Sequence, residues 1–336
     1  MKTKTPMALK RPAMLLAMAA LGAPLFAQAQ VVKIDGSSTV YPITEGVAED
    51  FQKLKKNVVK VTVGISGTGG GFKKFCRNEI DIADASRPIQ KKEMEDCKAA
   101  GIEYFELPIA FDALTVVVNP KNAFIKQLGI DELKTMWEPA AQGKVLRWKQ
   151  VNPAYPDAPM KLFGAGADSG TFDYFTEAVT GKSKSSRGDF TASEDDNVLV
   201  QGVAQDVNAL AFFGYAYYAE NQSRLRAVPI VAKAGQPAVA PSEKTVLDGS
   251  YQPLSRPIFI YVNAKSLAKP EVKEFVEYYM KESSKIAKEV KYVPLPAKAY
   301  TINLDHLAKG KKGTVFGGAN ELGITIETLL AREAKL

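Results

Sequence analysis

The distribution of apolar residues along the chain predicts an α/β protein. Short, largely apolar runs typical of strands recur at 58–64, 80–85, 113–120, 161–166 and 257–264. Helical segments lie between them. In ITEGVAEDFQKL, for example, Ile43, Val47, Phe51 and Leu54 recur at the spacing of one helix face. Strands that alternate with helices are typical of parallel or mixed sheets flanked by helices.

The length of the chain, 336 residues, favours two domains over one. LTVVVNPK at 114–121 and IFIYVNAK at 258–265 resemble each other, and each runs from an apolar strand into Val-Asn. A chain that leaves one domain and later returns must cross twice, and we interpret these two strands as the crossings and as the hinge. The expected lobe 1 then consists of 30–113 and 262–336, and the expected lobe 2 of 114–261.

The first 29 residues have the features of a signal peptide. Four basic residues precede the apolar run MLLAMAALGAPLF, which leads into the small-x-small sequence Ala27-Gln28-Ala29. A membrane-spanning helix needs about 20 apolar residues, and this run is shorter and is interrupted by Gly22 and Pro24. No cysteine follows it directly, which argues against a lipoprotein. We expect cleavage after Ala29 and a soluble periplasmic protein.

Export changes how charge and cysteine are interpreted. The four basic residues of the signal peptide account for more than half of the formal charge of +7, so the mature protein is only weakly basic. Nucleic acid is therefore excluded as a partner. The two cysteines are Cys76 and Cys97. An oxidising compartment favours a structural disulfide between them over a metal pair or a redox centre.

Three turns have the composition of anion-binding turns. DGSSTVYP at 35–42, SGTGGGF at 66–72 and ADSGTFDYF at 167–175 each follow a predicted strand and lead into a predicted helix. The start of a helix exposes unpaired N–H groups and partial positive charge, although Ser and Thr there are also ordinary N-caps. The second turn lacks the P-loop and dinucleotide patterns. Together, the three turns would surround a small oxyanion with donors, and no cofactor is expected.

A fourth segment, DIADASRPI at 81–89, adds a cation. Pro88 favours an extended conformation for Arg87, at the carboxyl end of a strand, where ligands of α/β sheets bind. The planar guanidinium of Arg87 would offer two parallel donors to an oxyanion.

Six segments in order resemble the periplasmic phosphate-binding proteins of ABC transporters, the PstS family. They are DGSSTVYP, SGTGGGFKKF, DIADASRPI, LKTMWEPAAQGKVLRWKQVNP, ADSGTFDYF and ALAFFGYAYYAEN, and the resemblance runs from Asp35 to Tyr292. It implies a type II periplasmic-binding fold, with two α/β lobes joined by two crossover strands. It also implies that inorganic phosphate is held in the cleft and delivered to membrane permease subunits. A monomer without catalytic activity is expected.

Matched position by position, the resemblance implies phosphate donors in all three turns: Ser38, Thr39, Thr68, Gly69, Ser169, Gly170 and Thr171. This chain departs from well-known members at two places. Ala165 and Ala167 stand where those members have an arginine and an aspartate, so Arg87 would supply the guanidinium.

The second departure concerns the aspartate that accepts the proton of hydrogen phosphate in well-known members. This chain has Ser86 at that position, and we expect Ser86 among the ligand residues. Asp168 and Asp84 are the candidates for the proton acceptor, and neither matches by position. Without a carboxylate in the cleft, selectivity against sulfate would be poorer.

Two alternatives stay open at this point. The chain could be a receptor for another tetrahedral oxyanion, such as sulfate, molybdate or arsenate. An exported serine-dependent phosphatase or hydrolase is disfavoured, because Ser169 lacks the GxSxG context. The only histidine, His306, lies in a polar stretch that predicts a surface residue, and no Cys–His cluster predicts a metal.

Overall fold

The structure is a computed structural model that describes residues 30–336 together with Met1. The expected signal peptide at 1–29 therefore lies, apart from Met1, outside the described residues. Among residues 30–336, every helix is too short or too polar to span a bilayer.

Lobe 1 is built on a sheet in which β1 pairs in parallel with β2 and β3, and β11 pairs antiparallel with β3 and β4. Its strands are β1 (Gln30–Gly36), β2 (Val59–Ile65), β3 (Ile82–Ala85), β4 (Tyr104–Val118), β11 (Ser255–Asn263) and β12 (Val293–Pro294). Its helices are α1 (Tyr41–Leu54), α2 (Gly67–Cys76), α3 (Lys91–Ala99), α10 (Pro270–Glu289), α11 (Ala297–Lys309) and α12 (Ile326–Glu333), and a 3-10 turn covers Ser266–Ala268.

Lobe 2 continues the sheet from β4, with β8 antiparallel to β4, and β6 parallel to both β8 and β7. Its strands are β5 (Leu128–Gly129), β6 (Lys161–Ala165), β7 (Thr191–Ser193), β8 (Ala209–Gly214), β9 (Arg226–Ala227) and β10 (Ile230–Val231). Its helices are α4 (Ile130–Trp137), α5 (Trp148–Val151), α6 (Gly170–Thr180), α7 (Asp196–Gln205), α8 (Tyr215–Glu220) and α9 (Glu243–Leu247), and a 3-10 turn covers Pro139–Ala141.

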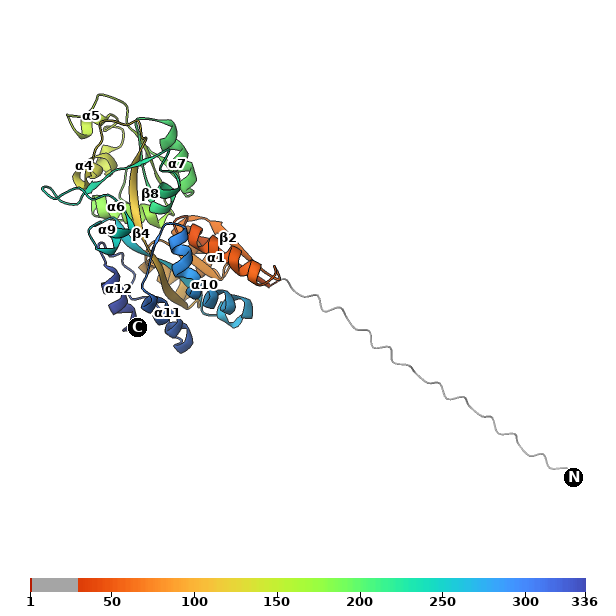
Figure 1. The fold of residues 1–336 in the computed structure, drawn as a ribbon. Helices are drawn as coiled ribbons and strands as arrows, with labels where there is room; N and C mark the ends of the chain where they lie inside the picture. Colours follow the sequence, from red (N-terminus) through yellow and green to blue (C-terminus); the bar gives the residue numbers. More distant parts are fainter. Residues whose placement is uncertain (2–29) are drawn as a thin grey trace.

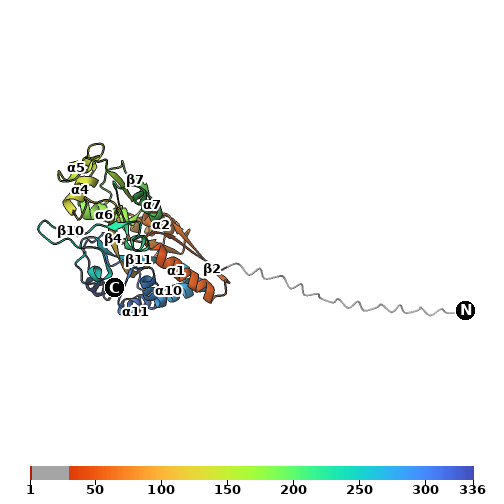
Figure 2. The ribbon, with the colours of Figure 1, turned by 45° about the horizontal axis from the view of Figure 1, so that its top comes forward.

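Strand β4 runs from one lobe into the other (Figure 1). It pairs with β11 as far as Ala113 and with β8 from Leu114 onward. The second view (Figure 2) shows α1, α10 and α11 together on lobe 1, with α4, α5 and α7 on lobe 2. The fold is the expected two-lobed α/β architecture.

The return crossing lies earlier than the sequence analysis expects. Strand β11 pairs with the lobe 1 strand β4 from Ser255 onward and with β3 from Phe259 to Val262. A boundary at 262 would cut this strand, because its Val-Asn end lies inside lobe 1 and not at the hinge. We therefore divide the chain into 30–113 with 255–336, and 114–254.

Aromatic side chains fill the core of each lobe. In lobe 1, Phe51 of α1 contacts Phe275 of α10, with ring centroids 5.3 Å apart. In lobe 2, Trp137 is fully buried, and its ring lies edge-on to Phe175 and Phe212 at 5.4 and 5.0 Å. The tryptophan has a packing role.

The expected disulfide is confirmed, since Cys76 at the end of α2 is bonded to Cys97 in α3. The expectation that His306 is a surface residue is wrong. His306 is 1% exposed, and its Nε2 lies 2.9 Å from the Glu333 carbonyl of α12. The polar residues around it in the sequence face solvent, while the imidazole turns inward to hold the last helix.

We expect the double variant Cys76→Ala, Cys97→Ala to lose about 3 kcal/mol of unfolding free energy, because the crosslink restricts the unfolded chain. Urea denaturation measures the loss, and wild type under reducing conditions is the matched control. Free-thiol labelling of the unfolded, unreduced wild type should find no thiol. Equal stability of variant and wild type would contradict the prediction.

Candidate functional site

The first and third anion-binding turns meet between the two lobes. Thr39 Oγ1 of lobe 1 lies 2.9 Å from Thr171 Oγ1 of lobe 2. Ser38, beside Thr39, is only 2% exposed. Ser169 is the N-cap of α6, and its Oγ accepts from the Thr171 N–H at 3.1 Å. The start of α1 therefore faces the start of α6.

The second turn and the end of β3 contribute another pair of hydroxyls. Thr68 Oγ1 lies 3.2 Å from Ser86 Oγ and accepts from the Ser86 backbone N–H at 3.1 Å. Gly170 of lobe 2 packs against this pair, since a Cβ there would lie 2.5 Å from Thr68 Oγ1 and 2.7 Å from Ser86 Oγ. The Gly69 N–H donates to the Asp168 carbonyl at 2.7 Å. The structure thus brings the donors of all three turns to one interlobe site.

A buried arginine that the sequence analysis did not select lies among these groups. Arg256 of β11 is 1% exposed. Its Nη1 donates to the Gly170 carbonyl at 3.0 Å, and its Nη2 donates to Thr171 Oγ1 at 2.8 Å. Its Nε and Nη2 also donate to Asp112 Oδ2 at 3.3 and 3.1 Å. A lobe 1 cation therefore reaches the start of α6 in lobe 2.

The sequence carries one signal for Arg256. The tetrapeptide Ser-Arg-Pro-Ile occurs twice, at 86–89 and at 255–258. Only the first copy is predicted to be part of the site, although the arginines of both copies are almost fully buried.

Arg87 also lies between the lobes, but carboxylates already occupy its guanidinium. Its Nη1 and Nη2 donate to the two carboxylate oxygens of Glu93 at 2.8 and 2.7 Å. Its Nε donates to Asp173 Oδ2 at 2.6 Å. Glu93 belongs to α3 of lobe 1 and Asp173 to α6 of lobe 2. The expected pair of parallel donors is directed at Glu93, so Arg87 links the lobes through protein groups.

The two candidate proton acceptors have other neighbours. The side chain of Asp168 is 39% exposed, and its oxygens pair with Lys73 Nζ at 2.8 and 3.0 Å. Asp84 is 1% exposed, and its carboxyl lies beside Thr44 inside lobe 1. Burial raises the pKa of Asp84.

A carboxylate that the sequence analysis missed, Asp196, lies beside the first turn. It is the first residue of α7, is fully buried, and accepts from Ser38 Oγ at 3.3 Å. Burial, and then the charge of Asp112, raises the pKa of Asp196 to about 7. In the sequence, the run Glu-Asp-Asp does not distinguish it from its exposed or half-buried neighbours.

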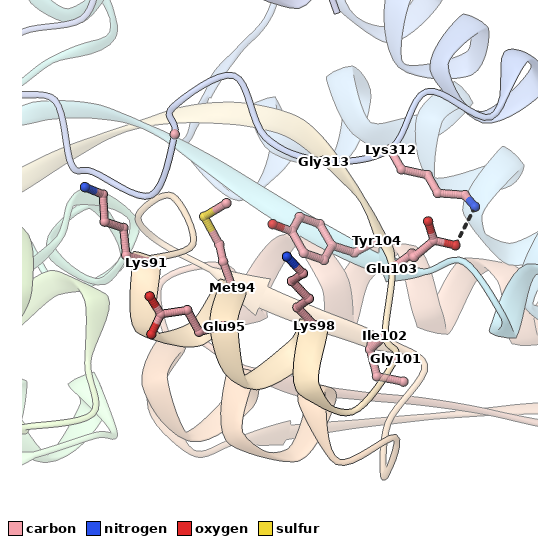
Figure 3. A pocket seen from close by; sticks show the side chains of 11 residues that line it. Lys91, Met94, Glu95, Lys98, Gly101, Ile102, Glu103, Tyr104, Lys312 and Gly313 are labelled. Carbon is pink, nitrogen blue, oxygen red and sulfur yellow. Dashed lines mark hydrogen bonds and ion pairs between the residues drawn. The ribbon is translucent and has the colours of Figure 1, made fainter.

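A hollow lies on the surface of lobe 1 (Figure 3). It has a volume of about 750 Å³ and is lined by residues of α3 and by Lys312, Gly313 and Gly317. Met94, Ile102 and Tyr104 line part of it, and the Lys312–Glu103 ion pair of 2.7 Å lies at one end. None of the residues of the three turns lines it.

Comparison with known proteins shows the family of the chain. Residues 26–283 match the model of a PBP superfamily domain. Protein SphX of Synechococcus elongatus is 51% identical over 332 residues, which are 97% of each chain. The phosphate-binding protein PstS of Staphylococcus saprophyticus is 40% identical over 273 residues, which are 80% of this chain and 82% of PstS.

A similar solved structure comes from Clostridium perfringens. It is a crystal structure with bound phosphate of a protein assigned as a phosphate ABC transporter substrate-binding protein. It is 25% identical, has a TM-score of 0.65, and the match covers 80% of this chain and all of that one.

The fold and the interlobe site define a two-lobed solute-binding protein of the PBP superfamily, a class of binding proteins and not of enzymes. Within this class, the chain belongs to the family of the proteins named PstS and SphX.

We expect Arg87→Met to lower the free energy of unfolding by about 3 kcal/mol, because it leaves Glu93 without its cation and leaves the buried Asp173 with only the more distant Lys184, at 3.7 Å. Urea denaturation measures the loss. The matched control is Arg77→Met, which breaks the exposed Arg77–Glu79 pair and should cost less than about 1 kcal/mol. Equal losses in the two variants would contradict the structural role of Arg87.

Proposed function

We propose that this protein binds inorganic phosphate between its lobes in the periplasm and delivers it to the permease subunits of an ABC importer. The observation that carries the proposal is the convergence of helix starts and hydroxyls from both lobes on one buried site beside Arg256. Membership in a family with a protein named phosphate-binding protein PstS supports phosphate as the ligand, as does the bound phosphate in the related structure.

The proposed ligand residues are the donors of the three turns and the end of β3, together with one buried arginine: Ser38, Thr39, Thr68, Gly69, Ser86, Ser169, Gly170, Thr171 and Arg256. The hydroxyls and backbone N–H groups would contact the oxygens. Arg256 already reaches Thr171 Oγ1 and the Gly170 carbonyl. Arg87 would act on the site by holding α3 and α6 together.

Dehydrating a dianion is costly unless charge-assisted hydrogen bonds replace its water. Hydrogen bonds to a charged group contribute about 1.5–3 kcal/mol each. The starts of α1, α2 and α6 add partial positive charge. Because these donors come from two lobes, the complete ligand shell forms only when the lobes are closed.

The proposal includes the exported form of the protein. The leader would be cleaved after Ala29. The mature chain would act as a monomer that carries phosphate through the periplasm to the permease. No lipid anchor is proposed, because the cysteines of the chain, Cys76 and Cys97, are joined to each other.

Calorimetric titration of the mature protein against a panel of oxyanions tests the function. We expect phosphate to bind more tightly than sulfate or molybdate, with arsenate as the nearest competitor because of its shape and protonation. Small-angle scattering should show compaction with phosphate. Sulfate or molybdate binding more tightly than phosphate would replace the proposal with the alternative receptor.

The glycine contact gives a test of the site itself. We expect Gly170→Ala to weaken phosphate binding about 10- to 100-fold, because the added methyl group separates the Thr68–Ser86 pair from α6, at the usual overpacking cost of about 1–3 kcal/mol. Gly188→Ala is the control, since a Cβ there meets only Gln142 Oε1 at 3.5 Å. Unchanged phosphate affinity in Gly170→Ala would mean that the start of α6 is not part of the ligand site.

A further inference from the structure

We propose that Asp196 is a specificity-determining residue of the phosphate site, and that its ionised carboxylate accepts the proton of a protonated tetrahedral anion and repels an anion that has none. This inference rests on the proposed function. It assigns a role to a residue that lies outside the three anion-binding turns.

The position of Asp196 is the first support. The side chain is fully buried. Its Oδ1 accepts from Ser38 Oγ at 3.3 Å, and Oδ2 has no hydrogen-bond partner among the residues that the structure describes. The Gly214 amide faces the same carboxyl group. A Cβ placed on Gly214 would lie 3.1 Å from Thr39 Cγ2 and 3.5 Å from Asp112 Oδ1, so this corner adjoins the first turn and the Asp112–Arg256 pair.

The charged neighbours are the second support. Asp112 of β4 and Arg256 of β11 face Asp196 from the sheet. Tyr217 of α8 and Tyr292, just before β12, face it from the other sides. Both phenol groups already donate hydrogen bonds to backbone carbonyls. Tyr217 donates to the Ser38 carbonyl at 2.9 Å, and Tyr292 donates to the Thr39 carbonyl at 2.5 Å.

Among residues 30–336, Asp196 therefore has no cation of its own. Arg256 already donates twice to Asp112. Burial raises the pKa of Asp196 to about 7, so the carboxyl changes its protonation state within the range in which a periplasmic protein works. Below this pKa the neutral carboxyl donates to any oxyanion. Above it the ionised carboxylate can only accept, and it requires a ligand that carries a proton.

The other two candidates are less suited to this role. Asp168 directs its carboxylate to Lys73 at the edge of the interface. Asp84 lies beside Thr44 and Tyr279 inside lobe 1. Asp196, in contrast, is hydrogen-bonded to Ser38, which neighbours the interlobe contact of Thr39 with Thr171.

The experiment measures phosphate and sulfate affinities by calorimetry and by competition, for wild type, Asp196→Asn and the control Asp195→Asn. The control removes the same charge one residue away, and asparagine remains a good N-cap for α7. At pH 8 we expect the ratio of phosphate to sulfate affinity to fall at least tenfold in Asp196→Asn, which corresponds to about 1.4 kcal/mol. In Asp195→Asn the ratio should stay within threefold of wild type.

A pH series on the wild type tests the proposal without any variant. Sulfate does not titrate between pH 5.5 and 8.5, the range of the series, so its affinity should fall as the pH rises through about 7 and Asp196 ionises. Selectivity for phosphate should rise over the same range. A flat sulfate profile, or an unchanged ratio in Asp196→Asn, overturns the role of Asp196 while phosphate binding stands. Failure of the wild type to bind phosphate overturns the proposed function and this inference together.

Discussion

The arrangement of the whole molecule depends on one strand, β4, that runs through the sheet of both lobes. Strand β4 pairs with β11 as far as Ala113 and with β8 from Leu114. Just before this change of partner, Asp112 lies directly opposite Arg256 in the antiparallel register. Their ion pair is buried, and removing one partner of a buried pair is strongly destabilising. The junction between the lobes is therefore fixed at the place where the proposed anion site lies.

This constraint explains why the site can be assembled from segments far apart in the sequence. The starts of α1 and α2 are held by β1 and β2, whose parallel pairing places both turns at one edge of the lobe 1 sheet. The start of α6 follows β6 in the lobe 2 sheet. Arg256 spans the remaining distance, because its side chain leaves lobe 1 and binds the first residues of α6. Across the lobes, the Thr39 hydroxyl meets the Thr171 hydroxyl, and the Gly69 N–H donates to the Asp168 carbonyl.

The features that the sequence could predict are those encoded within a few consecutive residues. The α/β alternation, the helix starts after the three turns and the Cys76–Cys97 bond all follow from local pattern or composition. The missed features depend on which distant groups meet. Arg256 sits in an apolar strand segment, Asp196 in an acidic run, and His306 in a polar stretch, so each has neighbours that suggest another environment. The same limit applies to Arg87, whose sequence position is right for a ligand donor but whose partners, Glu93 and Asp173, come from other elements.

The charge balance of the site differs from that of a simple cationic pocket. The two buried arginines pair with three acidic groups. Asp112 binds Arg256, while Asp173 and Glu93 bind Arg87. Burial raises the pKa of Asp112 and of Asp196. A nearby anion favours the neutral form of a carboxyl group, so an incoming oxyanion would raise these pKa values further. Anion binding at the proposed site would therefore be coupled to proton uptake, and hydrogen-bond direction, more than net charge, would decide which anion fits.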